Sequence, residues 1–315
     1  MKKFIKHLIL YLFFAVFVYT VLVIILGETS PEFFKKNLNY NLGSYGHTYT
    51  RFKNVDHVKD IDILFIGSSH TYRGFDPRYY QDEGYEVFNL GSSAQTHIQT
   101  NVLLKRYLDQ LNPKLAIYEV YPYMFCLDGV ESSIDLISND VNDIYSLEMG
   151  LKLNHLKVYN TLIYGFYRDL FNRNKNFTEK KKKGSDTYIE GGFVEREPRF
   201  FFTRDTSFSD RRWWIRQEQI DAFGENLAML KKRGIQIILV QTPITSNFYK
   251  AYTNYDEFNK RMKNYGTYYN FNEMLNLDDS LHFMDKHHMN HNGVKVFNET
   301  LLEIIKQDSP EFSMN

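Results

Sequence analysis

Residues 61–71 have the sequence IDILFIGSSHT, in which an apolar run ends at a glycine and two serines. A short apolar run bounded by turn-forming residues is typical of a buried β-strand. We expect a turn and then a helix to follow it. Side chains at the carboxyl end of a parallel strand face the crevice where open α/β sheets bind ligands. Ser69 is therefore the first candidate for a functional side chain.

Strand-like and helix-like runs alternate on both sides of this stretch. The predicted strands are 61–66, 86–90, 115–121 and 235–241. The predicted helices are 97–111, 220–230 and 294–304, where apolar residues recur every three or four positions. Strands that alternate with helices form parallel sheets. The sequence therefore predicts an α/β fold with a central parallel sheet.

Residues 8–27 form an apolar run without a single charge. At ~1.5 Å per residue, a helix of this length crosses a ~30 Å hydrocarbon core. Three lysines within residues 2–6 precede the run and Glu28 and Glu32 follow it, which places the N-terminus in the cytoplasm and the remaining chain outside. The run is longer than the apolar part of a signal peptide and no A-x-A-like site follows it. We expect this run to remain uncleaved and to anchor the protein in the cell membrane.

Composition excludes several classes of function. The 315 residues include 38 Lys and Arg against 38 Asp and Glu, so there is no basic excess for binding nucleic acid. Cys126 is the single cysteine. It cannot form an internal disulfide, and no cysteine pair can hold zinc or a cluster. With 43% hydrophobic residues the chain can still build an ordinary core.

The pattern of strands and helices is lost between about 126 and 214, where the sequence is rich in Tyr, Asn and Lys. We interpret this part as an insertion with an exposed loop. The lysines at 180–183 are expected to be solvated, with contact to anionic lipid or a teichoic polymer as the alternative. The predicted division is a cytoplasmic tip and anchor at 1–27, a juxtamembrane segment at 28–60, an extracytoplasmic domain at 61–306 and a tail at 307–315.

A second polar segment lies near the other end of the chain, where residues 285–293 have the sequence DKHHMNHNG. A serine nucleophile needs a base that takes its proton and a carboxylate that orients the base. Asp285 and His288 supply both from one loop. In a parallel sheet this loop and the turn after the first strand can open on the same edge, which predicts that Ser69 and His288 meet.

Three short motifs together resemble the blocks of the SGNH (GDSL-like) hydrolase superfamily. They are Gly-x-Ser at 67–69, Asn-x-Gly-Ser-Ser at 89–93 and Asp-x-x-His followed by glycine at 285–293. The resemblance implies a three-layer, flavodoxin-like fold that needs no cofactor and no metal. It also implies that Ser69 is the nucleophile and that Asp285 and His288 complete a catalytic triad.

The resemblance also implies an oxyanion hole made of backbone N–H groups, those of Ser69, Gly91 and Ala94. Ala94 stands where the family usually has glycine, and a backbone donor tolerates alanine there as long as φ stays negative. The usual Gly-x-Asn-Asp of the third block is replaced by Glu-Val-Tyr-Pro at 119–122. The candidate substrate contacts are His70, Arg73, Asn89 and Tyr121.

The anchor and the Gly-Ser-Ser-His form of the first block resemble one membrane-tethered branch of this superfamily. That branch includes the lipoteichoic-acid D-alanylation protein and alginate-type O-acetyltransferases. The resemblance implies acyl transfer, of an acetyl or D-alanyl group, to a cell-surface glycan or teichoic polymer. It also implies a membrane-bound O-acyltransferase as a partner.

Several alternatives remain at this stage. Water in place of the polymer hydroxyl would make the protein a carbohydrate or lipid esterase, and a chain without activity would be a polymer-binding partner of the acyltransferase. Ser93 is a rival nucleophile, and Ser69 could serve only as a helix cap. Imidazole and carboxylate groups also suit zinc. The residues of that alternative metal site are His282, Asp285, His287, His288 and His291.

Overall fold

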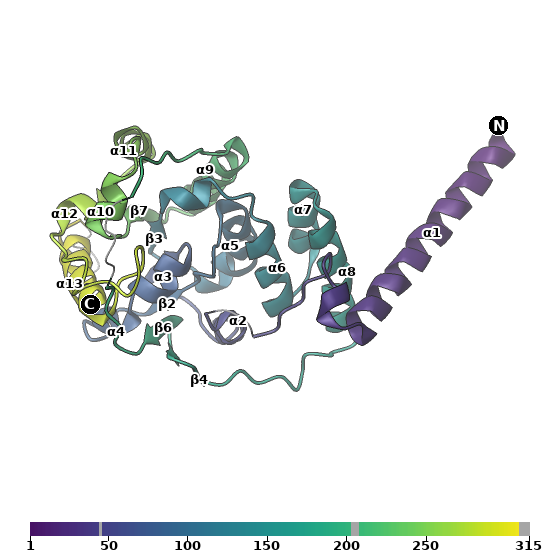
Figure 1. Ribbon diagram of the computed structural model, residues 1–315, viewed down its shortest axis with the longest axis horizontal. Coiled ribbons are helices and arrows are strands. Elements are labelled where there is room, and N and C mark those ends of the chain that lie inside the picture. Colours follow the sequence, from purple (N-terminus) through teal and green to yellow (C-terminus); the bar gives the residue numbers. More distant parts are fainter. Residues whose placement is uncertain (44–45, 203–207, 309–315) are drawn as a thin grey trace.

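The computed structural model describes residues 1–43, 46–202 and 208–308. A long helix, α1 (Lys2–Thr29), projects from the rest of the molecule (Figure 1). Within the described residues it is the one helix long and apolar enough to cross a membrane. Of the tail predicted at 307–315, residues 309–315 lie outside the described residues.

The centre of the fold is a five-stranded parallel sheet with strand order β2-β1-β3-β7-β8. Its strands are β1 (Ile63–Ile66), β2 (Val87–Asn89), β3 (Leu115–Glu119), β7 (Gln236–Gln241) and β8 (Tyr268–Asn270). This order is that of flavodoxin-like folds, in which ligands bind beyond the carboxyl ends of the central strands. The predicted α/β fold with a central parallel sheet is confirmed.

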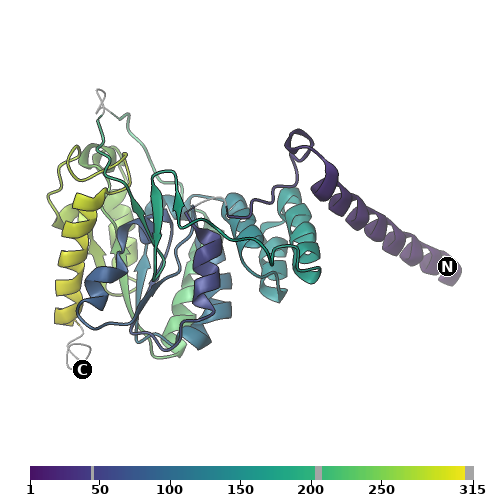
Figure 2. The same ribbon diagram turned by 90° about the horizontal axis from the view of Figure 1, so that it is seen from below.

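Helices cover both faces of the sheet because successive strand residues point to opposite faces. Leu64 and Ile66 of β1 pack into a core with α2 (Thr48–Val55), α5 (His97–Leu111) and α9 (Gln217–Lys232). Ile63 and Phe65 pack into a second core with α4 (Pro77–Gln81), α12 (Phe271–Met274) and α13 (His291–Asp308). Figure 2 shows α13 on one side of the sheet and α2 and α9 on the other.

Most of the predicted elements agree with the structure. The four predicted strands correspond to β1, β2, β3 and β7, and the three predicted helices to α5, α9 and α13. The sequence analysis missed β8, which has only three residues and ends at Asn270, so it has no long apolar run. It also missed α2, whose Phe52 and Val55 are buried in the core. Part of the predicted juxtamembrane segment is therefore built into the fold.

The region 126–214 contains more regular structure than we expected. Three helices follow one another, α6 (Val130–Asn139), α7 (Ile144–Leu153) and α8 (Leu156–Leu170). A small antiparallel sheet follows, made of β4 (Lys182–Lys183), β5 (Asp186–Ile189) and β6 (Phe193–Arg196). β6 packs against the short helix α3 (Ser69–Gly74), and α8 packs against α1. The insertion therefore contacts both the predicted site and the predicted anchor.

Asn298 on α13 fastens the last helix to the segment that follows β1. Its side-chain amide donates to the carbonyl of Gly74 at 2.7 Å. Its side-chain oxygen accepts hydrogen bonds from the N–H of Asp76 at 3.2 Å and from the hydroxyl of Tyr80 at 3.1 Å. The Asn298 side chain is fully buried. These bonds hold two segments together that are more than two hundred residues apart in the chain.

Replacement of Asn298 by alanine should therefore destabilise the fold. The change leaves the buried groups of Gly74 and Asp76 without partners, and we expect the free energy of unfolding to fall by about 2–4 kcal/mol. Urea unfolding of the detergent-solubilised chain measures it. Glu299→Ala is the matched control, because that side chain is exposed on the same helix. Equal stability of the two variants would contradict the role assigned to Asn298.

Candidate active site

The turn after β1 brings Ser69 to the start of a helix. Gly67 has φ +150°, and a Cβ atom added to it would lie 2.6 Å from the Cβ atom of Glu119. Only glycine fits this approach. Ser68 then caps α3, since its hydroxyl accepts a hydrogen bond from the N–H of His70 at 3.3 Å. Ser69 is the first residue of α3 and is half-buried at the carboxyl edge of the sheet.

The structure brings Ser69, His288 and Asp285 together. The hydroxyl of Ser69 lies 2.9 Å from Nε2 of His288. Nδ1 of His288 lies 2.9 Å from a carboxylate oxygen of Asp285. This is the order of contacts that a serine nucleophile, its base and an orienting carboxylate require. The geometry agrees with the predicted triad, and the catalytic roles of the three residues stay a prediction.

Asp285 is bound so that it stays ionised. Its Oδ1 accepts hydrogen bonds from the N–H groups of His287 and His288, each at 2.9 Å. Burial raises the pKa of this carboxyl, but the hydrogen bond to His288 and the charges of His288 and His287 outweigh it and hold the pKa well below its usual range. An ionised carboxylate at this place fixes the orientation of the His288 ring and stabilises its protonated form.

Two of the three predicted oxyanion donors are free to act. Among the hydrogen bonds of the described residues, none uses the N–H group of Ser69 or of Ala94. Both residues line one cleft. The prediction for Gly91 is wrong, because its N–H donates to the side-chain oxygen of Asn89 at 2.9 Å.

Ala94 adopts a conformation that we did not expect. Its φ is +50°, in the left-handed region, whereas alanine was expected to keep a negative φ. This conformation costs an L-residue about 1–2 kcal/mol. Backbone strain of this kind occurs at sites where the surrounding structure holds it in place. The surrounding loop therefore holds Ala94 in a conformation that glycine would adopt without this cost.

The prediction that Asn89 contacts substrate is wrong. Asn89 is fully buried at the end of β2. Its side-chain amide donates to the carbonyl of Thr71 at 2.9 Å, and its side-chain oxygen accepts from Gly91. Asn89 therefore connects the loop that carries Ala94 to the helix that carries Ser69. Its role is to position these two segments.

Arg73 is neutralised by an ion pair within the protein. Its guanidinium forms two hydrogen bonds with Asp186 of β5, at 3.2 and 2.8 Å. Burial raises the pKa of the Asp186 carboxyl, but the hydrogen bonds from Arg73 and Arg196 outweigh this effect and hold the pKa at about 2. The predicted contact of Arg73 with an acidic substrate is not supported. The ion pair joins α3 to the insertion.

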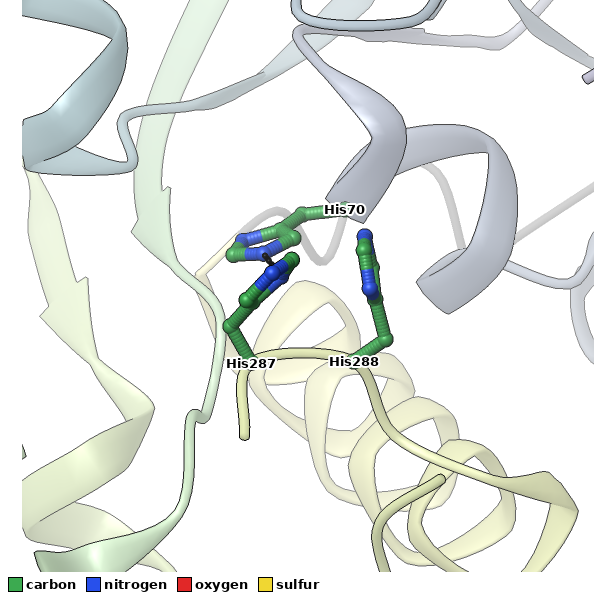
Figure 3. Close-up of side chains that lie close together, drawn as sticks. All are labelled: His70, His287 and His288. Carbon is green, nitrogen blue, oxygen red and sulfur yellow. Dashed lines mark hydrogen bonds between the residues drawn. The ribbon is translucent and has the colours of Figure 1, made fainter. Parts of the chain in front are cut away.

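His70 and Tyr121 line the cleft beside Ser69, as predicted for substrate contacts. Their rings lie 4.2 Å apart. Nε2 of His70 lies 3.4 Å from Nδ1 of His287 (Figure 3). Burial, together with the neighbouring His288, lowers the pKa of His70 well below its usual value and that of His287 to about 4. Both rings are therefore neutral near pH 7, so neither opposes a positive charge on His288.

The alternative metal site predicted in the loop 282–291 is not assembled as expected. Nδ1 of His282 accepts a hydrogen bond from the backbone N–H of Asp278. His291, the first residue of α13, lies against the ring of Phe200. A different group is close together, in which one ligand atom each of His70, His287 and His288 lies within 4.8 Å of the others. Three imidazoles can hold zinc. A metal ion there would compete with Ser69 and Asp285 for the nitrogens of His288.

The sequence analysis missed the part played by Glu119 at the end of β3. One carboxylate oxygen accepts hydrogen bonds from the N–H and the hydroxyl of Ser68, both at 2.9 Å, and the other accepts from the N–H of Tyr121 at 2.6 Å. Burial raises the pKa of Glu119 to about 7, although these bonds lower it. The sequence did contain a signal for this role. Glu119 ends an otherwise apolar strand, and an acidic residue is rarely buried unless it has a hydrogen-bonding partner.

The cleft beside Ser69 has a volume of about 400 Å³ and is lined mainly by aromatic and apolar side chains. Two cationic groups lie beside Phe248, whose ring lines the cleft. The guanidinium of Arg211 lies 5.5 Å from the centre of the Phe248 ring, and the ammonium of Lys286 lies 4.9 Å from it. No ion pair within the described ranges uses Arg211 or Lys286. The cleft therefore offers flat apolar surfaces and positive charge next to the serine.

No family model matches the chain, and no curated protein matches it. Two proteins are among the solved structures that are similar to it at the level of the fold. One is a protein assigned as an acylhydrolase from Bacteroides fragilis NCTC 9343, with 11% identity and a TM-score of 0.41 over 84% of this chain and 98% of the other. The second is a GDSL-like lipase from Bacteroides thetaiotaomicron VPI-5482, with 10% identity and a TM-score of 0.44 over 84% of this chain and 100% of the other.

The buried carboxyl of Glu119 predicts a pH dependence of stability. A folded-state pKa of about 7 lies above the usual 4.5, so the stability that Glu119 contributes is complete below pH 4.5 and is lost as the pH rises through 7. The expected loss is about 2–3 kcal/mol. Chemical unfolding of the wild type and of Glu119→Gln from pH 5 to pH 8 measures it. Parallel curves for the two proteins would contradict this assignment.

Proposed function

We propose that the protein is a membrane-anchored serine enzyme that cleaves and transfers acyl esters. The observation that carries the proposal is the series of contacts from Ser69 through His288 to Asp285. In the first step His288 takes the proton of the Ser69 hydroxyl while its oxygen attacks the acyl carbonyl. The free N–H groups of Ser69 and Ala94 supply hydrogen bonds to the oxyanion that forms.

The second half of the reaction uses the same residues in reverse. The tetrahedral intermediate collapses to an acyl ester on Ser69, and the leaving group departs with the proton held by His288. His288 then takes a proton from the hydroxyl of the acceptor, which attacks the acyl-enzyme and frees Ser69. A sugar or polyol hydroxyl as acceptor gives a transferase, and water gives an esterase.

The contacts of α1 support an uncleaved anchor. The hydroxyl of Tyr19 donates to the side-chain oxygen of Asn160 at 2.5 Å, and Val23 is buried in one small core with Tyr164. Glu28 accepts a hydrogen bond from the hydroxyl of Tyr164 at 3.0 Å. Removal of α1 as a signal peptide would uncover all of these groups. With the lysines at its start, α1 would place the cleft outside the cell.

The lining of the cleft favours a cell-surface polymer as acceptor. Sugars pack on aromatic faces, and Tyr121, Tyr123 and Tyr252 provide such faces within reach of Ser69. Arg211 and Lys286 would attract an anionic polymer, such as a teichoic polymer or an acidic glycan. A membrane-bound O-acyltransferase as donor partner is consistent with an anchored enzyme that has its acceptor outside.

Covalent labelling of Ser69 tests the enzymatic proposal most directly. A fluorophosphonate probe should form an adduct on Ser69 in the full chain, located by mass spectrometry. Ser69→Ala should lose the adduct and at least about 10³-fold of the turnover of an activated acetyl ester. Ser93→Ala should keep both to within about tenfold. Ser69→Ala with full function in cells would instead support a non-catalytic, polymer-binding role.

The acceptor decides between transferase and esterase. We expect the full chain, given an activated acetyl ester and a sugar or teichoic polymer, to produce the acetylated polymer, because the cleft can place a polymer hydroxyl beside the acyl-enzyme. Mass spectrometry of the polymer and a free-acetate assay measure the two products. Free acetate as the sole product would overturn the transferase and leave the esterase.

The three clustered histidines give metal-dependent hydrolysis a test of its own. If Ser69 is the nucleophile, a chelator should leave the turnover of the acetyl ester unchanged, and added zinc should lower it by occupying His288. Turnover at a series of EDTA and zinc concentrations measures both effects. Loss of turnover with EDTA and its return with zinc would favour the metal mechanism.

A further inference from the structure

The helix α7 and the start of α8 carry large apolar side chains that are exposed in the described structure. Leu147, Leu151 and Leu156 have exposed fractions of 40%, 61% and 53%. Leu147 and Leu151 are four residues apart and lie on one face of α7, and Leu156 begins α8 directly after the turn. Three neighbouring exposed leucines are unusual on a surface that faces water.

The helix α8 lies beside the end of α1 and runs in the same direction. Tyr19 contacts Asn160, and the ring of Tyr164 lies so close to Gly27 that a Cβ atom there would meet it at 2.5 Å. Glu28, one residue later, pairs with Arg173 at 3.1 Å. The contacts thus follow the same order along both helices, from Tyr19 with Asn160 to Glu28 with Arg173, so α1 and α8 run in the same direction.

This order places the turn before α8 level with the apolar part of α1. Asn160 is already level with Tyr19, so Leu156, one helical turn earlier, is level with residues near the middle of the apolar run. In Figure 1 the tip of the α7–α8 pair points to the same side as the N-terminal end of α1. The exposed leucines therefore face the region that a membrane around α1 would occupy.

The length of α1 leads to the same conclusion. Its contacts with α8 begin at Tyr19. The apolar residues 8–18 before that point span only about 16 Å, roughly half of the ~30 Å hydrocarbon core. The outer half of the core must then be crossed by the part of α1 that is in contact with α8. The start of α8 cannot stay in water if α1 spans the membrane.

We propose that the α7–α8 turn is a second membrane contact, in which Leu147, Leu151 and Leu156 insert among the acyl chains of the outer leaflet. This inference rests on the anchoring of α1 that the proposed function includes. The insertion is shallow, about 5–10 Å as for interfacial helices. Lys157 directly follows Leu156, and its long side chain can reach the lipid phosphates.

The charges at the other end of α8 fit this placement. Arg168 and Arg173 lie near Glu28, at 3.7 and 3.1 Å, where α1 leaves its apolar run. Phe171 beside them is exposed. Basic and aromatic side chains prefer the headgroup region of a membrane. The apolar end of α8 would thus lie deeper than its charged end.

Depth-dependent fluorescence quenching tests the proposal in the full chain. An environment-sensitive label (NBD) is attached to Leu151→Cys in a Cys126→Ala background, in vesicles of phosphatidylethanolamine and phosphatidylglycerol. We expect a blue-shifted emission and several-fold stronger quenching by doxyl-labelled lipids than for a label at Lys295→Cys, which is exposed on α13. Leu156→Cys provides an independent second position. Quenching at both sites no stronger than at Lys295→Cys would overturn the proposal, and a protein would then be the occupant of the leucines.

Two controls separate this inference from the proposals on which it depends. A label at Leu10→Cys on α1 should be quenched strongly if α1 spans the membrane. Strong quenching at Leu10→Cys without quenching at Leu151→Cys overturns the second contact and leaves the anchor, whereas no quenching at either site overturns both. Fluorophosphonate labelling of Ser69 in the same vesicles reports the enzymatic proposal separately, because it does not depend on the depth of the turn.

Discussion

The close approach between the end of β1 and the end of β3 is the constraint on which the site depends. Gly67 leaves no room for a side chain next to Glu119, and the Glu119 carboxylate then binds both the N–H and the hydroxyl of Ser68. These contacts fix the turn, so that Ser69 becomes the first residue of α3 with its N–H unused by that helix. A single buried carboxylate thereby positions both the Ser69 hydroxyl and the N–H group that we propose as an oxyanion donor.

Three other attachments bring the remaining parts of the site to this turn. Asn89 holds the loop of Ala94 against α3, and Asn298 holds α13, with the Asp285–His288 loop before it, against the same segment. Arg73 and Asp186 attach the insertion. Each attachment uses buried or half-buried polar groups that hydrogen-bond to a distant segment, which fixes the geometry but makes the structure sensitive to substitution.

The sequence predicted those features that depend on periodicity or on short motifs. Apolar runs located four of the five strands of the central sheet, and the two motifs around Ser69 and Asp285 located side chains that prove to be in contact. It did not predict the conformation of Ala94, since a φ of +50° is set by the surrounding loop and not by alanine itself. The buried roles of Asn89, Glu119 and Arg73 depend on partners from distant segments, which no local pattern contains. The helices α6, α7 and α8 were missed because the polar, aromatic composition of the insertion hides their apolar faces.

The contacts between α1 and α8 have a consequence for how the proposed enzyme would find its substrate. A catalytic domain on a flexible tether can search a wide volume of the cell envelope, but here the junction is stiffened by Tyr19, Gly27 and Glu28. The domain would be held rigidly on the bilayer, with the opening of its cleft at one fixed height above the membrane. Strands of the proposed acceptor polymer would have to reach that height by their own motion. Acylation would then favour the polymer segments that lie nearest to the membrane.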